Sequence, residues 1–319
     1  MPWLIYALGG GWGHLTRAAA LARAAASCHA VRILTNSPYA AQVSGLDIVV
    51  VASREAALAQ IEAARPDALI VDTFPRGLGG ELAAILPALE ATKILVHRDL
   101  SSEYVSAASL RDFVASNYDL VLIPGEGEGC EFPGEVTEPW LVRSADELSA
   151  AAPKGRPVVC ASGNAEELAW YGEVAAQLAD SLCVAAVCPP GCPPERWIRH
   201  WPAIDLFPGA PVIVGGGGYN TVQEALACRV PLVARPWPRK YDRQSDRAAR
   251  AARLGDVSVV TTPEEAISAA RHYRGAGPWP ACFPNGAHDA VSRIASAIRP
   301  GLRQIHREPP QTPRHGGEA

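Results

Sequence analysis

Short apolar runs alternate along the chain with longer helical segments, a pattern typical of strands separated by helices. In the first half, strands are expected at residues 3–8, 31–35, 48–52, 68–71, 94–97 and 120–123, and helices at residues 17–26, 55–64 and 81–90. Strands and helices in this order join by right-handed crossovers into a parallel sheet that is covered on both faces. Ligands bind such sheets outside the carboxyl ends of the strands.

Residues 124–157 interrupt the alternation, because they are rich in Gly, Glu and Pro and show little periodicity, and we expect a linker there. The pattern then resumes, with strands expected at residues 158–161, 182–187, 204–207, 212–214, 231–234 and 257–260, and helices at residues 166–179, 263–272 and from about residue 220. We therefore predict two α/β domains, residues 1–140 and 141–285, with a helix at 286–299 that packs back on the first domain. The polar residues 300–319 are expected to form a disordered tail.

The composition excludes only a few classes of protein. A net charge of −4 gives no reason to expect an extended nucleic-acid-binding surface. No stretch resembles a signal peptide or a membrane span, so a cytoplasmic location is expected. Cys188 and Cys192 lie close together in CPPGC, but no second Cys or His pair lies at ligand spacing, so we expect no metal there. The oligomeric state is not indicated.

Four consecutive glycines, residues 215–218, separate an apolar run from a helical pattern. Backbone N–H groups at a helix N-terminus favour an anion, so this turn predicts a phosphate site. Glu224, one helical turn further on, is placed to accept hydrogen bonds from ribose hydroxyls. The structural alternative is a capping box, in which Asn220 or Thr221 caps the helix and Gln223 or Glu224 completes the box.

A second glycine-rich turn, GGGWGHLTR at residues 9–17, lies between the first strand and the first helix. The string is not GxGxxG and no acidic residue closes a βαβ unit about twenty residues on, so dinucleotide binding is disfavoured. His14 lies near the helix start, where a neutral imidazole could take a proton from a hydroxyl or a water. The alternative is a histidine that only caps the turn.

Two further segments end strands of the second half. In PRKYDRQSDR, Asp242 and Gln244 could bind sugar hydroxyls, and Lys240 or Arg243 could face phosphate; the alternative is a solvated loop in which Asp242 caps the next helix. In SGN, the residues Ser162, Gly163 and Asn164 face the same edge and could equally cap a helix.

Asp72 and Asp99 end strands of the first half. Either could orient His14, bind a second substrate or cap a loop. Of the two we predict Asp99 as a catalytic residue in addition to His14. No group of carboxylates in the sequence demands a metal ion.

These residues together resemble the glycosyltransferase-B superfamily, and most closely the peptidoglycan N-acetylglucosaminyltransferase (MurG-like) family and its uncharacterised relatives. The resemblance covers most of the chain and is carried by GGGWGHLTRA and by GGGGYNTVQEALACRVPLVARPWPRKYDRQSDRA, with support from IVDTFPRG and ILVHRDL. It implies two Rossmann-like domains whose parallel sheets face a central cleft. It also implies an inverting, metal-independent hexosyltransferase that moves a sugar from a nucleotide-diphosphate sugar, usually a UDP-sugar, to an acceptor hydroxyl.

The resemblance also implies residue roles. The donor diphosphate would be held by Gly216, Gly217, Gly218, Tyr219, Asn220 and Thr221, with Ser162, Gly163, Asn164, Gly11 and Gly13 facing it. Glu224 would bind the ribose and Gln244, with Asp242 and Arg243 beside it, the transferred sugar. His14 would be the general base. No metal or cofactor is implied, because helix N-termini can stabilise the leaving diphosphate.

Several alternatives stay open. The family's paired glutamines appear here as Gln244 and Ser245, so the donor sugar is not indicated, and neither are the base and the acceptor. GWGHLTRA also resembles the GxGHxxR motif of the UDP-sugar hydrolase of pseudaminic acid synthesis, whose histidine is thought to activate water. A non-catalytic nucleotide-sugar-binding protein is the third alternative. A peripheral membrane contact is left open as well.

Overall fold

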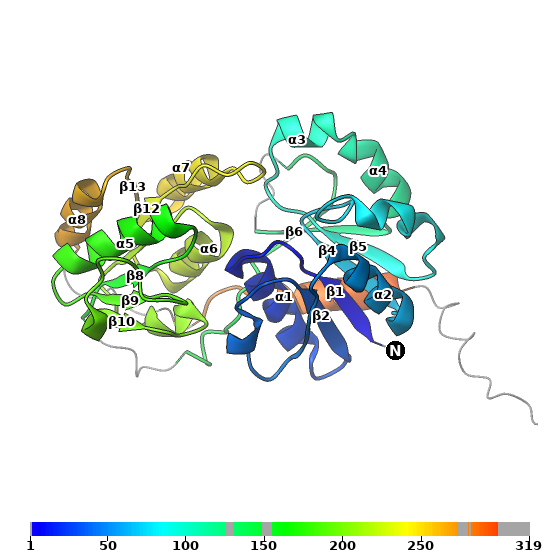
Figure 1. Cartoon of the computed structure of the whole chain (residues 1–319), viewed down its shortest axis with the longest axis horizontal. Helices are drawn as coiled ribbons and strands as arrows, with labels where there is room; N and C mark the ends of the chain where they lie inside the picture. Colours follow the sequence, from blue (N-terminus) through cyan, green and yellow to red (C-terminus); the bar gives the residue numbers. More distant parts are fainter. Residues whose placement is uncertain (1, 126–129, 149–154, 274–279, 281, 299–319) are drawn as a thin grey trace, which may run out of the picture.

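Two α/β domains make up the protein, each built on a parallel sheet (Figure 1). The computed structural model describes residues 2–125, 130–148, 155–273, 280 and 282–298. The predicted tail at residues 300–319 lies outside this range. Two parallel sheets, each with helices between its strands, confirm the predicted fold class.

The first sheet has the order β3-β2-β1-β4-β5-β6-β7, and every neighbouring pair is parallel. Its strands are β1 (Trp3–Tyr6), β2 (Val31–Thr35), β3 (Asp47–Val50), β4 (Ala68–Asp72), β5 (Thr92–Val96), β6 (Leu120–Pro124) and β7 (Glu135–Thr137). β1 and β4 are buried along their whole length, as expected for central strands that are covered on both faces. The carboxyl ends of β1, β4 and β5 point to the second domain, so residues that follow them reach the space between the domains.

The helices of the first domain are α1 (Trp12–Ala25), α2 (Arg54–Ala64), α3 (Ser102–Ala107) and α4 (Leu110–Asn117), with a 3₁₀ turn η1 (Ala40–Gln42). The helix predicted at residues 81–90 is wrong. That segment forms two 3₁₀ turns, η2 (Glu81–Ala84) and η3 (Leu86–Ala88). Pro87 is the physical reason, since it has no N–H to donate and its ring clashes with the preceding turn of an α-helix.

The second sheet has the order β10-β9-β8-β11-β12-β13, again with parallel neighbours. Its strands are β8 (Val158–Cys160), β9 (Leu182–Val184), β10 (Trp197–Ile198), β11 (Ile213–Gly216), β12 (Leu232–Arg235) and β13 (Val257–Val259). Its helices are α5 (Ala165–Gln177), α6 (Tyr219–Cys228), α7 (Gln244–Leu254) and α8 (Pro263–His272), with 3₁₀ turns η4 (Pro194–Arg196) and η5 (Ala203–Leu206).

The strand predicted at residues 204–207 is wrong, because this segment is the 3₁₀ turn η5 and the edge strand is β10. Asp205 N donates to Pro202 O at 3.2 Å, and Phe207 N donates to Ile204 O at 3.1 Å. Ile204 and Phe207 are both fully buried. Their spacing of three residues places both side chains on one face of a 3₁₀ turn, whereas a strand would send them to opposite faces.

The linker predicted at residues 124–157 is also partly wrong, since it contains the edge strand β7. β7 pairs with β6 in parallel, with Ile123 opposite Val136. Residues 126–129 and 149–154 of that segment lie outside the described residues. Between them the chain crosses to the second domain, where Arg143 Nε donates to Asp205 Oδ1 at 2.8 Å.

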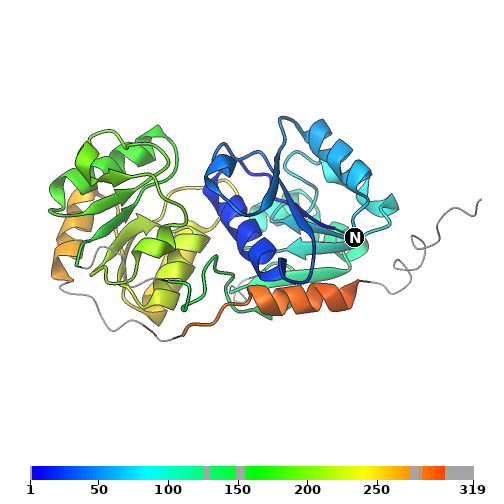
Figure 2. The ribbon, with the colours of Figure 1, turned by 90° about the horizontal axis from the view of Figure 1, so that it is seen from below.

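Helix α9 (Ala287–Ala297) returns to the first domain and packs against α1 and β6 (Figure 2). Ala290 and Ile294 are fully buried in this contact. Gly286, the residue before the helix, donates its N–H to Pro139 O at 2.9 Å. An added Cβ at Gly286 would lie 2.1 Å from Glu138 O, so only glycine fits where the returning chain meets the outgoing one.

Candidate functional site

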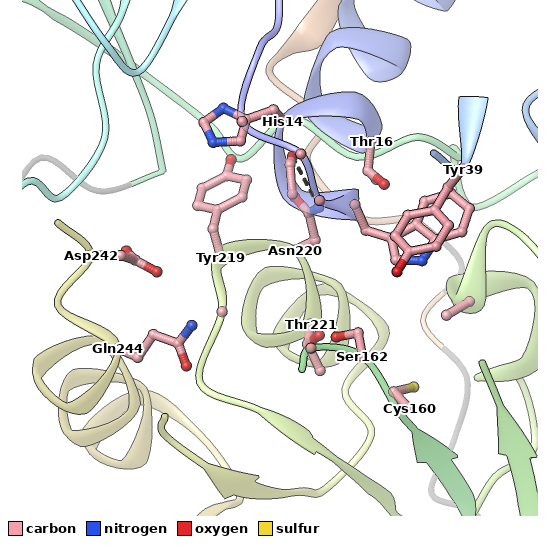
Figure 3. A pocket seen from close by; sticks show the side chains of 18 of the residues that line it. His14, Thr16, Tyr39, Cys160, Ser162, Tyr219, Asn220, Thr221, Asp242 and Gln244 are labelled. Atoms are coloured by element: carbon pink, nitrogen blue, oxygen red, sulfur yellow. Dashed lines mark hydrogen bonds between the residues drawn. The ribbon is translucent and has the colours of Figure 1, made fainter. Parts of the chain in front are cut away.

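A cleft of about 520 Å³ lies between the two domains and collects the carboxyl ends of both sheets (Figure 3). Its volume is in the range of small-molecule binding sites. The two walls meet directly, because Asn220 Nδ2 of α6 lies 3.4 Å from Gly13 O of α1 and donates to it. The helix N-termini of α1 and α6 therefore face each other across the cleft.

The first glycine-rich turn is held by a residue that the sequence did not single out. Asn36, directly after β2, accepts hydrogen bonds from Gly9 N and Gly10 N through Oδ1, each at 2.9 Å. Gly9 makes room for the histidine, since an added Cβ would lie 2.1 Å from His14 Cδ2. A polar residue at the carboxyl end of a strand is the signal that could have pointed to Asn36.

His14 lies in the first turn of α1 and contacts Asp72 at the end of β4. Its Nδ1 lies 2.5 Å from Asp72 Oδ2. Arg17, one turn further along α1, donates to both oxygens of Asp72, with Nε 2.7 Å from Oδ1 and Nη2 2.6 Å from Oδ2. Because the Asp72 carboxylate accepts from Nδ1–H, the Nε2 lone pair of His14 stays available to accept a proton.

The charges around this pair favour a neutral imidazole and an ionised carboxylate. Burial lowers the pKa of His14 below its ordinary value, and this effect outweighs the Asp72 contact, which raises it. Burial alone would raise the pKa of Asp72, but the Arg17 guanidinium and the contact with His14 hold it well below its usual range. The arrangement is therefore suited to a base that is free of its proton near neutral pH.

Asp99, the second predicted catalytic residue, lies away from His14. Its side chain is 1 % exposed, pairs with Arg243 and Arg250, and does not line the cleft. Arg98 and Leu100 on either side of Asp99 line the cleft. The Asp99 carboxylate between them is directed to Arg243 and Arg250 of the α7 region and not to α1. The prediction of Asp99 is therefore corrected, because the carboxylate that contacts His14 is Asp72.

The second glycine-rich turn opens α6 without any side-chain cap. Gly218 is the N-cap, and among the residues that the structure describes no side-chain cap hydrogen bond is made, so the capping box that was the alternative role of Glu224 is not formed. Gly218, Tyr219, Asn220 and Thr221 line the cleft. Uncapped N–H groups and the helix dipole together make this N-terminus an anion-binding site.

Two of the four glycines do not reach the cleft, which corrects their predicted contact with the ligand. Gly216 is still part of β11 and pairs with Arg235 of β12. Gly217 is packed against the next loop, where an added Cβ would lie 2.9 Å from Gln244 O. Both residues therefore let β11 and β12 approach closely and carry the chain to the N-terminus of α6.

Glu224 lines the cleft from α6 and is 5 % exposed. Within the part of the chain that the structure describes, its carboxyl group has no hydrogen-bond partner. Burial, with a smaller contribution from the charge of Asp205, raises the pKa of Glu224 to about 8. A buried carboxyl group that faces a cleft without a protein partner is suited to bind hydroxyl groups of a ligand.

The loop before α7 supplies Asp242 and Gln244 to the cleft, and Lys240 lies at its edge. Gln244 accepts a hydrogen bond from Trp237 N through Oε1 at 3.0 Å, which leaves its amide NH₂ directed to the cleft (Figure 3). Asp242 does not cap α7, whose N-cap is Arg243. Arg243 turns away to Asp99 and does not line the cleft, so its predicted contact with the donor is not made in this arrangement.

In the segment after β8, too, only some of the predicted residues line the cleft. Ser162 and Gly163 line the cleft. Asn164 is the N-cap of α5 and accepts a hydrogen bond from Glu167 N at 2.9 Å, as its structural alternative predicted, and it does not line the cleft. Gly163 has a φ of +128°, which glycine adopts without strain.

Three aromatic rings at one end of the cleft were not predicted as site residues. Trp12 is stacked on Tyr39 with ring centroids 4.7 Å apart, and on Trp201 of the second domain with centroids 6.3 Å apart. Trp201 Nε1 also donates to Thr16 Oγ1 at 3.2 Å. All three rings line the cleft and come from three separate segments, which is why no single motif revealed the stack.

Among the residues described, no group of three His, Cys, Asp or Glu side chains is placed to hold a metal ion. Cys188 and Cys192 are free thiols. Cys188 Sγ lies 3.8 Å from Cys192 O, so the pair closes its own loop. In the same part of the chain no helix is long and apolar enough to cross a membrane.

No family model and no curated protein matches the chain. Solved structures do. The glycosyltransferase of kitacinnamycin has a TM-score of 0.57 at 17 % identity, covering 93 % of this chain and 99 % of that one. The glycosyltransferase SsfS6 of Streptomyces sp. SF2575, complexed with thymidine diphosphate, has a TM-score of 0.58 at 17 % identity, covering 93 % and 99 %.

The spinosyn rhamnosyltransferase SpnG, also complexed with thymidine diphosphate, has a TM-score of 0.58 at 16 % identity, covering 93 % of this chain and 92 % of that one. Likeness over nearly the whole of both chains places the two domains and their order in the glycosyltransferase-B fold. At this level of identity the comparison establishes the fold, and the activity has to be argued from the site.

Proposed function

We propose that this protein is an inverting glycosyltransferase that moves a sugar from a nucleotide-diphosphate sugar to an acceptor hydroxyl. The observation that carries the proposal is the pair of His14 and Asp72, set across the cleft from the uncapped N-terminus of α6. One wall offers a base and the other offers an anion site. A reaction that removes a proton from one substrate and releases a diphosphate from the other needs both.

The donor would lie along the second domain. The N–H groups at the start of α6 would bind the diphosphate, and Ser162 and Gly163 would lie beside it. Glu224 would accept hydrogen bonds from the ribose hydroxyls, in keeping with a buried carboxyl group that has no partner in the described chain. The NH₂ group of Gln244 would bind a hydroxyl of the transferred sugar.

The reaction would be a single displacement. The acceptor oxygen forms a bond to the anomeric carbon while the bond from that carbon to the phosphate oxygen breaks, and the electron pair leaves on the diphosphate. The acceptor proton passes to Nε2 of His14, whose imidazolium is stabilised by Asp72. Two helix N-termini face the diphosphate, which supports a metal-independent reaction.

The donor nucleotide is proposed to carry a pyrimidine base, uracil or thymine. The family resemblance favours uracil, whereas the solved structures of VinC, SsfS6 and SpnG were obtained with thymidine diphosphate. Calorimetric titration with UDP, dTDP, ADP and GDP tests this part. Tighter binding of one pyrimidine nucleotide is expected, and equal affinity for all four would contradict it.

A nucleotide-sugar hydrolase is the second candidate, because the cleft-facing imidazole of His14 could equally take its proton from water. Incubation with UDP- and dTDP-sugars in the absence of any acceptor separates the two. A transferase should release nucleotide slowly until an acceptor mixture is added. Rapid release of free sugar without acceptor would assign hydrolysis in place of transfer.

A further inference from the structure

Arg98, which is in the first domain but faces the second, lies where a donor diphosphate would meet both domains. It follows β5 and lines the cleft, with 8 % of its surface exposed. A buried guanidinium is retained only where anions or other acceptors surround it. Its ion-pair partner is Asp242, whose Oδ1 lies 2.7 Å from Nη2.

This partner satisfies Arg98 only in part. Asp242 Oδ1 also accepts from Arg247 Nη2 at 2.8 Å, so one carboxylate oxygen is shared between two guanidiniums. Arg98 Nε is buried and has no hydrogen-bond partner within the described residues. The guanidinium thus has capacity for a further anionic partner, and its position is fixed from one side by Asp242.

The rest of the guanidinium faces the two helix N-termini. It lies over the ring of Tyr219, the first residue of α6, at 5.9 Å from the centroid. Arg98 Nη1 also lies close to Gly13, in the first turn of α1. A Cβ added at Gly13 would lie 3.9 Å from this nitrogen. Arg98 therefore lies between the starts of α1 and α6, where its guanidinium is close to the positive ends of two helix dipoles.

We propose that Arg98 binds the β-phosphate of the donor and stabilises the charge that develops there as the sugar leaves. This inference rests on the proposed function and adds a diphosphate contact from the acceptor-side domain. When the bond from the anomeric carbon to oxygen breaks, the electron pair stays on the β-phosphate, and a charge-assisted hydrogen bond from Arg98 strengthens. Asp242 acts as the positioning residue that holds the guanidinium in place.

The test compares nucleoside diphosphates with monophosphates, since only the former carry the phosphate that Arg98 would bind. Calorimetry with UDP, UMP, dTDP and dTMP is run on the wild-type protein, Arg98→Gln, Arg98→Lys and the control Arg32→Gln. Arg32 is an exposed residue of the same domain that pairs with Asp47. We expect Arg98→Gln to weaken diphosphate binding at least about tenfold and monophosphate binding less than about twofold.

Arg98→Lys keeps the charge and should lose less diphosphate affinity than Arg98→Gln, because a point charge replaces a planar donor. It also covers the case in which Arg98→Gln does not fold. If either variant lost affinity equally for diphosphates and monophosphates, Arg98 would have a purely structural role and the proposal would be overturned. Unchanged diphosphate affinity in Arg98→Gln would overturn it as well. If the wild-type protein binds none of the four nucleotides, the proposed function itself fails.

Discussion

The two glycine-rich turns have the same local design but differ in the chemistry that follows each. Both α1 and α6 begin after a glycine N-cap, neither is capped by a side chain, and both starts face the cleft. His14 lies in the first turn of α1, whereas Glu224 lies in the second turn of α6. The two titratable groups differ in their surroundings, and that difference separates a proton acceptor from a ligand-binding carboxyl group.

His14 contacts an ionised partner, whereas Glu224 contacts none among the described residues. Burial lowers the pKa of His14 and raises that of Glu224 to about 8, because in each case it disfavours the charged form. Asp72 shows the opposite outcome for a buried carboxylate, since Arg17 and His14 keep it ionised. Partners, and not burial alone, therefore decide which carboxyl group is charged.

The largest effect is expected from removal of the base. His14→Ala should lower turnover by about 10²- to 10⁴-fold, the usual contribution of a general base, because His14 is the proposed acceptor of the proton. Affinity for the nucleotide should change by less than about twofold, since His14 is on the opposite wall from the donor. Steady-state kinetics and calorimetry measure the two quantities, and unchanged turnover would remove His14 from the mechanism.

A smaller loss of turnover is expected when the imidazole of His14 is displaced but not removed. In Gly9→Ala the new Cβ would lie 2.1 Å from His14 Cδ2, so the imidazole must move. A shift of about 1 Å in a catalytic group costs on the order of 10²-fold in rate. Gly11→Ala serves for comparison, because an added Cβ there meets no atom within 4 Å. Equal turnover of the two variants would contradict this role of Gly9.

On the other wall, Glu224→Gln should weaken nucleotide binding by about tenfold, because an amide replaces the acceptor of the ribose hydroxyls. The same change should stabilise the unliganded protein as pH rises. The folded-state pKa of about 8 lies above the ordinary value of 4.5, so ionising Glu224 destabilises the wild-type fold progressively between these values. We expect a melting temperature about 5 °C above wild type at pH 8 and little difference at pH 4.5.

The control for this carboxyl group is Glu166→Gln, an exposed position in the first turn of α5. It should change neither affinity nor the pH dependence of the melting temperature. An unaltered affinity in Glu224→Gln would count against a ribose contact. A melting difference that does not grow with pH would show that folding does not raise the pKa of Glu224.

The smallest expected effect is a shift in the acid limit of activity. Burial lowers the pKa of His14 below 6.5, so the base should stay neutral at pH 6.5 and lose activity only at lower pH. The pH profile of kcat/KM should therefore show an acid limb with a midpoint below 6.5. His200→Gln, at an exposed histidine on the cleft, should leave that midpoint in place. A midpoint above 6.5 would exclude His14 as its source.

The sequence was sufficient to predict a feature where the residues that determine it lie in one segment of the chain. The alternation of strands and helices predicted both parallel sheets, and the two glycine-rich turns marked the two helix N-termini that face the cleft. Two of the errors have different causes, one inside the segment and one in a neighbouring strand. Pro87 breaks a segment of otherwise helical composition, and the strand β7 exists only because the edge of β6 is there to pair with it.

The choice between Asp72 and Asp99 shows the limit of sequence most clearly. Both residues follow buried strands of one sheet, and in the sequence they are equivalent candidates. In the folded chain Arg17 draws Asp72 toward α1 and His14, whereas Arg243 and Arg250 draw Asp99 toward α7 of the other domain. The partners lie 55 residues from the first aspartate and 151 residues from the second, counted to Arg17 and Arg250.

What the sequence by itself determined is the set of local elements: parallel strands, glycine turns, and a histidine and a glutamate on the helices that follow them. Those features depend on residues near one another in the chain. The tertiary structure alone decided which carboxylate contacts His14, that Asn36 holds the first turn, and that Arg98 lies between two helix starts. These contacts join segments far apart in the chain. The first two are set by packing within the first domain, and the place of Arg98 beside α6 is set by how the two domains pack.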